Sequence, residues 1–137
     1  MKENNLDQIM DYLLKKPGAH IDFPFGADTP VIKVSGKMFA LAGSMSGEPS
    51  ISYKCEPLMA DALRREYDAV KPGYYLNKRH WNTISLNGSL TDEQLMEFGD
   101  ISYALVLKTL TKAERAALES EGDKRMSGPG PEWGGVI

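Results

Sequence analysis

A tight turn between two short apolar runs constrains the fold of this chain more than any other sequence feature. Residues 31–34 are mostly β-branched, Ser35-Gly36-Lys37 follow, and residues 38–42 form a second, mainly apolar run. Two such runs joined by so short a polar connection predict a β-hairpin, in which the strands are antiparallel. The other elements must therefore be built around at least one antiparallel strand pair.

Further strands are expected on either side of this hairpin. Residues 51–55 alternate apolar and polar side chains, as a half-buried strand does. Residues 74–76 fit a short strand, and residues 81–86 fit a stronger one that ends before Asn87-Gly88. Residues 43–49 contain two glycines and a proline, which predict a loop. His20 and Asp22 occupy alternate positions of one more candidate strand.

Four helices are expected around these strands. Residues 6–14 carry apolar side chains at helical spacing, with Asn4 or Asn5 as the cap and Pro17-Gly18 as the stop. Pro57 opens a second helix. Residues 91–94 and 111–114 each show a capping-box pattern, which predicts a long third helix and a last helix that ends at about Glu119. The apolar face of the second helix is assigned to Leu58, Met59, Ala62, Leu63 and Tyr67.

These elements predict an α+β fold with an antiparallel sheet of about five strands and helices packed on one face. The 137 residues fit a single domain, which we place at residues 1–120. Glycine and proline dominate residues 121–137, a composition typical of a flexible tail. Trp133 and Val136 are the two residues of this tail that could dock against the domain.

The composition limits the classes of function. The net charge is −3, which argues against a wholly basic nucleic-acid binder, so any contact with a polyanion must be local. Cys55 is the only cysteine, so no intrachain disulfide can form. Residues 1–11 do not resemble a signal peptide, and no apolar run approaches the roughly 18 residues of a membrane helix. We therefore expect a cytoplasmic protein with no membrane partner.

The positive charge is concentrated in the segments that bear strands. Residues 29–55 carry a net charge of +2 and residues 69–91 carry +3, so the rest of the chain carries −8. The second segment contains Lys71, Lys78 and Arg79 and no acidic residue. Such a separation of charge can orient a protein toward a polyanion. Lysines on strand edges also block edge-to-edge aggregation, and both interpretations stay open at this point.

Trp81 also has two interpretations. Alternation along the strand at residues 81–86 places Trp81 with Thr83 and Ser85, on the face opposite Ile84. On the outer face of the sheet, beside Arg79, Trp81 could stack on a base. It could equally be buried, with its indole N–H bonded to the backbone.

Several motifs of the chain resemble those of the MmcQ/YjbR family. The resemblance covers about residues 5–118 and is most specific in the run that begins at Pro72, and the tail beyond Glu121 lies outside it. It implies a small bacterial α+β protein with a CyaY-like fold, of a kind described as DNA-binding through a double-wing motif, and it supplies no catalytic residues. The motifs are Lys16-Pro17-Gly18, Phe25-Gly26, Val34-x-Gly36-Lys37-Met38-Phe39-Ala40 and Pro72-Gly73-Tyr74-x-Leu76-Asn77-Lys78-x-His80-Trp81-Asn82.

Two functions are therefore considered. The first is DNA binding through cationic turn and strand segments, and the alternative is a protein-interaction or adaptor domain that uses the same cationic face for an acidic protein partner. Phe25 and Phe39 are assigned to core and turn positions and are not expected to stack on bases. The candidate nucleic-acid-binding residues are Lys37, Lys71, Lys78, Arg79, His80, Trp81 and Asn82.

Enzyme chemistry is not expected. The chain has no Walker loop, no Gly-x-Ser-x-Gly elbow and no recognised set of metal ligands. His20 and Asp22 could point the same way, but nothing in the sequence brings His80 to them. We therefore predict neither a metal site nor a cofactor, and assign no catalytic residue.

Overall fold

A single antiparallel sheet organises the computed structural model, which describes residues 3–125. Every pair of neighbouring strands is antiparallel, in the order β1-β2-β3-β4-β6-β5. The predicted α+β class is confirmed, with a six-stranded sheet where about five strands were expected. The strands are β1 (His20–Asp22), β2 (Val31–Val34), β3 (Lys37–Met45), β4 (Glu48–Lys54), β5 (Val70–Pro72) and β6 (Trp81–Ser85).

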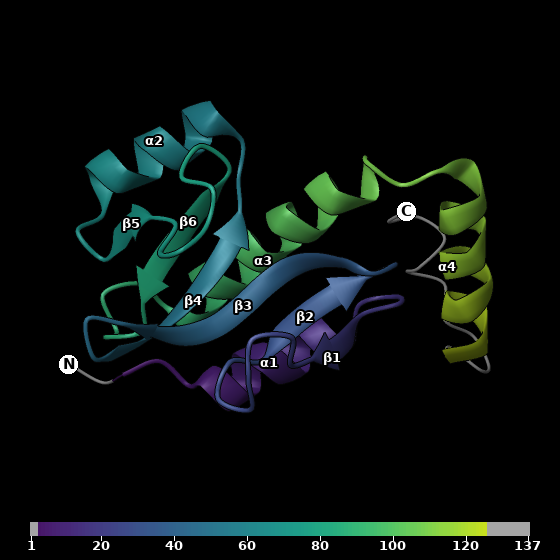
Figure 1. Ribbon diagram of the computed structural model, residues 1–137, viewed down its shortest axis with the longest axis horizontal. Helices are drawn as coiled ribbons and strands as arrows, with labels where there is room; N and C mark the ends of the chain where they lie inside the picture. Colours follow the sequence, from purple (N-terminus) through teal and green to yellow (C-terminus); the bar gives the residue numbers. More distant parts are fainter. Residues whose placement is uncertain (1–2, 126–137) are drawn as a thin grey trace.

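The helices cover one face of the sheet and leave the other face to loops. In Figure 1, α1 and α3 pass behind the strands, α2 lies beside the β5 edge, and α4 stands at the far end of the molecule. This agrees with the predicted packing of helices on one side. The helices are α1 (Leu6–Leu14), α2 (Pro57–Glu66), α3 (Asp92–Leu107) and α4 (Lys112–Arg125).

Side-chain caps begin the helices as the sequence predicts. Asn5 caps α1 by accepting a hydrogen bond from the Gln8 backbone N–H. Thr91 and Gln94 form a reciprocal capping box at the start of α3. Thr111 and Glu114 exchange the same two bonds at the start of α4. Each cap satisfies backbone donors that a helix N-terminus otherwise leaves unpaired.

Two hairpins are closed by Ser-Gly turns. Ser35 and Gly36 have φ values of 49° and 77°, and Ser46 and Gly47 have values of 53° and 83°. Positive φ at both central residues is the geometry that matches the twist of a two-residue hairpin. The prediction of a loop at residues 43–49 is therefore wrong, since β3 continues to Met45 and β4 begins at Glu48.

Two other predicted boundaries differ from the structure. The expected strand at residues 74–76 is a turn in which Tyr75 has a φ of 62°. The strand lies a few residues earlier, where β5 (Val70–Pro72) pairs with β6. Helix α4 continues to Arg125 where we expected an end at about Glu119, so residues 121–125 of the predicted tail are helical. The rest of the predicted tail, with Trp133 and Val136, lies outside the described residues.

Gly99 allows α3 to approach the sheet and α1 closely. A Cβ at this position would lie 2.4 Å from Cδ2 of Leu13 on α1 and 3.3 Å from the hydroxyl oxygen of Tyr53 on β4. Both of these side chains are buried, so neither can swing out into solvent. Within the described residues, none of the helices is long and apolar enough to cross a membrane.

We predict that Gly99→Ala destabilises the protein. Overpacking a closed core costs about 1–3 kcal/mol, and the better helix propensity of alanine returns at most about 1 kcal/mol. Urea unfolding should therefore show a lower free energy of unfolding for Gly99→Ala. Glu97→Ala, at an exposed position of the same helix, serves as the control and should change stability by less than about 0.5 kcal/mol. A Gly99→Ala variant as stable as wild type would contradict this packing.

Candidate binding groove on the open face of the sheet

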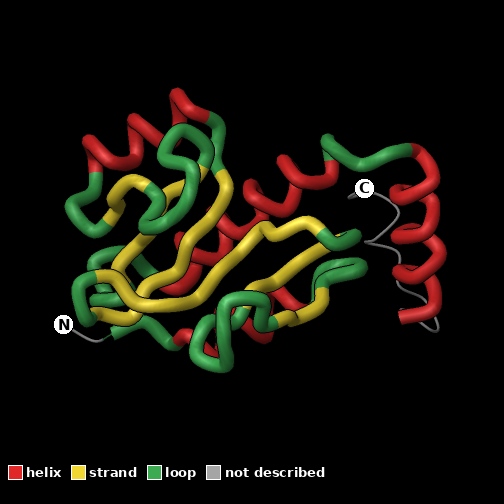
Figure 2. The backbone as a smooth tube through the Cα atoms, viewed as in Figure 1, coloured by secondary structure: helices red, strands yellow, loops and turns green. Residues whose placement is uncertain are grey.

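The face of the sheet that carries no helix holds a groove of about 360 Å³. Phe25 and Thr29 of the β1–β2 loop form one wall, and residues 74–76 of the β5–β6 loop form the other. Figure 2 shows these two loops on opposite sides of the central strands. The floor comes from β3, β4 and β6, and includes Ser52 and Thr83. Segments that are distant in the sequence thus meet over one hollow of the sheet.

The groove has an uncharged lining. Every residue that contributes to it is aromatic, aliphatic, a glycine, a serine or a threonine. The Tyr74 hydroxyl, like any tyrosine hydroxyl, is neutral at physiological pH, and the nearby hydroxyl of Tyr75 raises its pKa further. This composition suits a ring that offers an apolar face and polar edges, and suits a phosphate poorly.

Hydroxyl groups on the floor form a short hydrogen-bonded chain. The Tyr74 backbone N–H donates to Oγ1 of Thr83 at 2.8 Å, and this oxygen lies 2.7 Å from Oγ of Ser52. One of the two hydroxyl protons joins Ser52 to Thr83. The other has no acceptor within the described residues, so the floor offers one unused donor.

Exposed aromatic rings stand on both walls. The exposed fractions are 63% for Phe25, 40% for Tyr74 and 88% for Tyr75. The rings of the two tyrosines are 4.4 Å apart between centroids. Phe25 lies in a turn and Phe39 in the core, as the sequence predicts, but the Phe25 ring is mostly in solvent at the groove.

Tyr75 has an unfavourable backbone conformation. Its φ of 62° lies in the left-handed region, which β-carbon contacts make costly for residues other than glycine. A ring that is 88% exposed gains little from packing in return. Residues in such strained backbone conformations cluster at active sites and at segments that hold ligands.

The motif at residues 72–82, which is the most specific one in the sequence, forms one wall of the groove. The Gly73 N–H donates to the Trp81 carbonyl oxygen at 2.9 Å, and Nζ of Lys78 donates to the Gly73 carbonyl oxygen at 2.9 Å. Oδ1 of Asn77 accepts from the backbone N–H groups of Arg79 and His80. The loop at residues 73–80 is thus closed by its own polar groups.

Arg64 of α2 fastens this loop from the other side of the sheet. Its Nε donates to Oδ1 of Asn82 at 2.7 Å, and a terminal nitrogen donates to the carbonyl oxygens of Lys78 and Trp81. Nδ2 of Asn82 donates in turn to the Ala60 carbonyl oxygen at 3.2 Å. One guanidinium therefore ties α2, β6 and the loop together.

The sequence analysis did not identify Arg64, although a signal was present. Ala60, the most buried residue of α2, precedes Arg64 by four positions, so the two share a helix face. The predicted apolar face of α2 included Leu58, but this side chain is 87% exposed. An arginine on the true inner face needs several carbonyl partners, which the β5–β6 loop supplies.

Two of the predicted nucleic-acid-binding residues are buried. Trp81 lies on the open face as alternation predicts, but it is only 9% exposed because the loop at residues 73–80 covers it. A Cβ on Gly73 would lie 2.8 Å from the Trp81 Cβ, so this cover is tight. Asn82 is 2% exposed and is bonded to Arg64. Neither side chain lines the groove, and the Asn82 amide is bonded to Arg64 and Ala60, so this burial argues against the predicted contact role of both residues.

The other five predicted residues are exposed, and all of them except Lys37 lie on β5 or on the β5–β6 loop. Lys71, on the edge strand β5, pairs with Thr83 of the groove floor. Arg79 and His80 lie on the loop of the groove wall, and within residues 3–125 the guanidinium of Arg79 has neither a hydrogen bond nor an ion pair. Lys78 is bonded within its loop. Lys37 lies at the β2–β3 turn and bonds Thr109 after α3, away from the groove.

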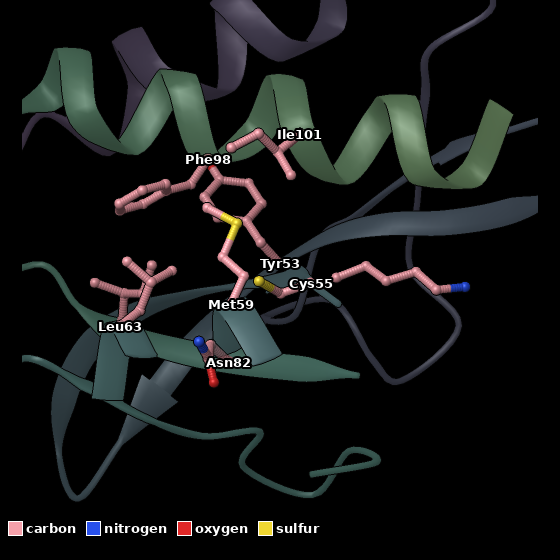
Figure 3. Close-up of a pocket in the computed structure, with 9 residues that line it drawn as sticks. Tyr53, Cys55, Met59, Leu63, Asn82, Phe98 and Ile101 are labelled. Atoms are coloured by element: carbon pink, nitrogen blue, oxygen red, sulfur yellow. The ribbon is translucent and has the colours of Figure 1, made fainter. Parts of the chain in front are cut away.

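A second hollow lies on the helix side and is much smaller. Figure 3 shows Met59 and Leu63 of α2 and Phe98 of α3 pointing toward one another above β4. Its volume of about 10 Å³ holds at most one water molecule. Burial raises the pKa of the Cys55 thiol in its lining, which makes this cysteine less reactive.

Among residues 3–125, no three histidine, cysteine or acidic side chains are grouped so that they could hold a metal ion. Nδ1 of His20 lies 3.0 Å from the Gly18 carbonyl oxygen. Asp22 accepts a hydrogen bond from Lys33 at 2.9 Å, which lowers the pKa of its carboxyl group. His20 thus interacts with the segment before β1, and Asp22 with the neighbouring strand β2.

The sequence profile of the YjbR family matches residues 14–105. The chain belongs to the YjbR family. YjbR of Escherichia coli is 33% identical over 113 residues, which cover 82% of this chain and 96% of that protein. YbdF of Escherichia coli is 30% identical over 102 residues, which cover 74% of this chain and 84% of that protein.

Solved structures agree with the family assignment. A Deinococcus radiodurans protein with a DUF419 domain superposes with a TM-score of 0.77 at 34% identity, over 85% of this chain and 89% of that one. A Pseudomonas syringae protein superposes with a TM-score of 0.65 at 29% identity, over 74% of this chain and 97% of that one. The resemblance to the MmcQ/YjbR family is therefore confirmed, and the fold is that of this family.

We predict that Arg64→Ala destabilises the protein by about 2–3 kcal/mol. The change removes charge-assisted hydrogen bonds and leaves Oδ1 of Asn82 buried without its donor. Arg64→Lys should restore little of this, because one ammonium cannot reproduce the planar fork of a guanidinium. Thermal and urea unfolding measure both effects.

The next residue of the helix supplies the control. Arg65 is exposed and makes only a surface ion pair with Asp61 at 3.4 Å. Arg65→Ala should change the free energy of unfolding by less than about 0.5 kcal/mol. Equal losses for Arg64→Ala and Arg65→Ala would show that Arg64 does not hold the loop.

Proposed function

We propose that this protein binds single-stranded nucleic acid across the open face of its sheet. The strand lies along the groove, with bases against the aromatic walls and phosphates near the cations of the β5 edge and the β5–β6 loop. The partner is still a nucleic acid, as the family resemblance implies. The proposed contact differs, because bases of a single strand stack on aromatic rings, whereas the hypothesis from the sequence had cationic turns contact DNA.

Tyr75 carries this proposal. Its ring is the most exposed large apolar side chain of the described residues, and its backbone is held in a conformation that costs stability. Aromatic side chains on an open sheet face are what sequence-tolerant single-strand binders use to stack bases. An exposed ring beside a groove, on a residue with a costly backbone conformation, is best explained by a ligand that covers the ring.

The charges near the groove also favour a nucleic-acid strand whose phosphates lie toward the β5 edge. Lys71 and Arg79 are exposed at the β5 side of the groove, and the segment of residues 69–91 holds no acid. At the other end of the floor, Glu48 accepts a hydrogen bond from the Ser85 hydroxyl at 3.2 Å. Phosphates are therefore attracted to the β5 edge and repelled from the β3–β4 turn.

We predict that Tyr75→Gly weakens binding without loss of stability. A left-handed residue other than glycine costs about 1–2 kcal/mol, and the added chain entropy of glycine returns part of this. The melting temperature should therefore stay level or rise. Removing one stacked base is worth about 1–3 kcal/mol, so affinity for a labelled single strand should fall about 5- to 100-fold.

Leu58→Ala is the matched control for Tyr75. Leu58 is 87% exposed, close to the value for Tyr75, but it lies on α2 and not at the groove. Its replacement should leave single-strand affinity unchanged. A Tyr75→Gly variant that binds as tightly as wild type would remove the main support for the proposal.

We predict that Arg79→Ala and Lys71→Ala each weaken the binding of all single-stranded sequences by a similar factor. Each lost phosphate contact should also lower the salt dependence by about 0.7 in log–log slope. Fluorescence anisotropy at several salt concentrations measures both quantities. Lys112→Ala, at an exposed cation of α4, should change neither quantity.

Lys37 distinguishes this proposal from duplex binding through the turns. A duplex bound at the β2–β3 turn and the β5–β6 loop requires both Lys37 and Arg79, whereas a strand in the groove requires Arg79 but not Lys37. A large loss of duplex affinity on Lys37→Ala would favour the turn-based mode. Absence of any nucleic-acid binding at low salt would instead favour the protein-interaction domain.

A further inference from the structure

We infer that the groove recognises the uncharged base of a nucleotide directly. Free nucleosides and nucleotides therefore occupy it through the base, and any phosphate stays outside. This rests on the proposed function, because the same groove is used, but it assigns the ligand chemistry of the floor. The base lies between the walls of the two loops, its edge accepts a hydrogen bond from the hydroxyl pair of Ser52 and Thr83, and any phosphate stays outside.

The uncharged lining is the first support for this. No lysine, arginine, histidine or acidic residue lines the groove, and no helix begins there. A phosphate that entered it would lose its hydration without gaining a cation. A neutral heterocycle gives up far less hydration and gains contact with Phe25 and Tyr75.

The Ser52–Thr83 pair is the second support. Oγ1 of Thr83 already accepts from the Tyr74 N–H, and one hydroxyl proton is used between the two side chains. The described residues contain no acceptor for the remaining proton. Ser52 and Thr83 are 2% and 1% exposed, but both line the groove, so a base edge that reaches the floor can accept this proton. Carbonyl oxygens and ring nitrogens of bases are acceptors of this kind.

The size of the groove is the third support. Its volume of about 360 Å³ falls at the lower end of the range for small-molecule sites. Thr83 is fixed by β6 pairing on both sides, and Tyr74 is fixed by its bond to Thr83. The donor and one aromatic wall are therefore held in place before a ligand binds, which lowers the entropic cost of binding.

The test measures the binding of uridine, uridine monophosphate and a short uridine oligonucleotide by tyrosine fluorescence and calorimetry. Uridine and its monophosphate should bind with affinities within about threefold of each other, because the phosphate lies outside the groove. The double variant Ser52→Ala/Thr83→Val should bind both about three- to tenfold more weakly, the loss of one hydrogen bond.

Two further variants separate this loss from misfolding. Thr83→Ser keeps both hydroxyls and should bind as wild type does. Ser85→Ala removes a hydroxyl of the same strand and face that is bonded to Glu48, so it should leave nucleoside affinity unchanged. Thermal melting confirms that each variant is folded before its affinity is compared.

The outcomes for the two proposals can be told apart. Oligonucleotide binding that persists in a folded Ser52→Ala/Thr83→Val variant, with no nucleoside binding to wild type, overturns the inference and leaves the proposed function standing. Nucleoside binding without oligonucleotide binding supports the inference and overturns the proposed function. Equal binding of neutral sugars such as glucose would overturn base recognition, since the groove would then select a ring of another class.

Discussion

The hydrogen bonds of Arg64 are the interaction on which the open face of this protein depends. A single guanidinium on α2 reaches Asn82 on β6 and two carbonyl oxygens of the β5–β6 loop. The loop is thereby pressed onto the sheet, where it buries Trp81 and raises the wall of the groove. Without this contact the loop would lose its bonds to α2 and keep only its internal bonds and its backbone bonds to β6 and Cys55, so that this side of the groove would be held less firmly.

The same contact gives the motif at residues 72–82 a structural role that the sequence alone did not indicate. Its asparagines, lysine and tryptophan resemble a nucleic-acid surface in composition. In the structure they act on the chain itself: Asn77 and Lys78 close the loop, and Asn82 receives Arg64. What this loop presents to a partner is the rings of Tyr74 and Tyr75 and the side chain of Arg79.

Local patterns predicted much of the fold and little of the site. The hairpin at residues 31–42, the helix caps and the packing of helices on one face all follow from short-range rules of spacing and turn chemistry. Long-range partners do not follow from such rules. The pairing of Ser52 with Thr83, 31 residues apart, and the reach of Arg64 over 18 residues to Asn82 depend on strand register and helix placement. The groove is made of such pairs.

Stability and the proposed binding oppose each other at Tyr75, where an exposed ring is kept in a strained conformation. The helix face shows no comparable feature, since its hollow holds at most one water molecule. In the proposed function the two faces therefore have different roles: the helix face contains the core, and the loop face meets the partner.

Mapping amide chemical shifts by nuclear magnetic resonance, while a short single-stranded oligonucleotide is added, tests this assignment most directly. The account predicts that the largest shift changes fall on the two loops and on the strands of the groove floor, around Phe25, Tyr75 and Thr83. Changes centred instead on α2 and α3, or at the β2–β3 turn around Lys37, would contradict it.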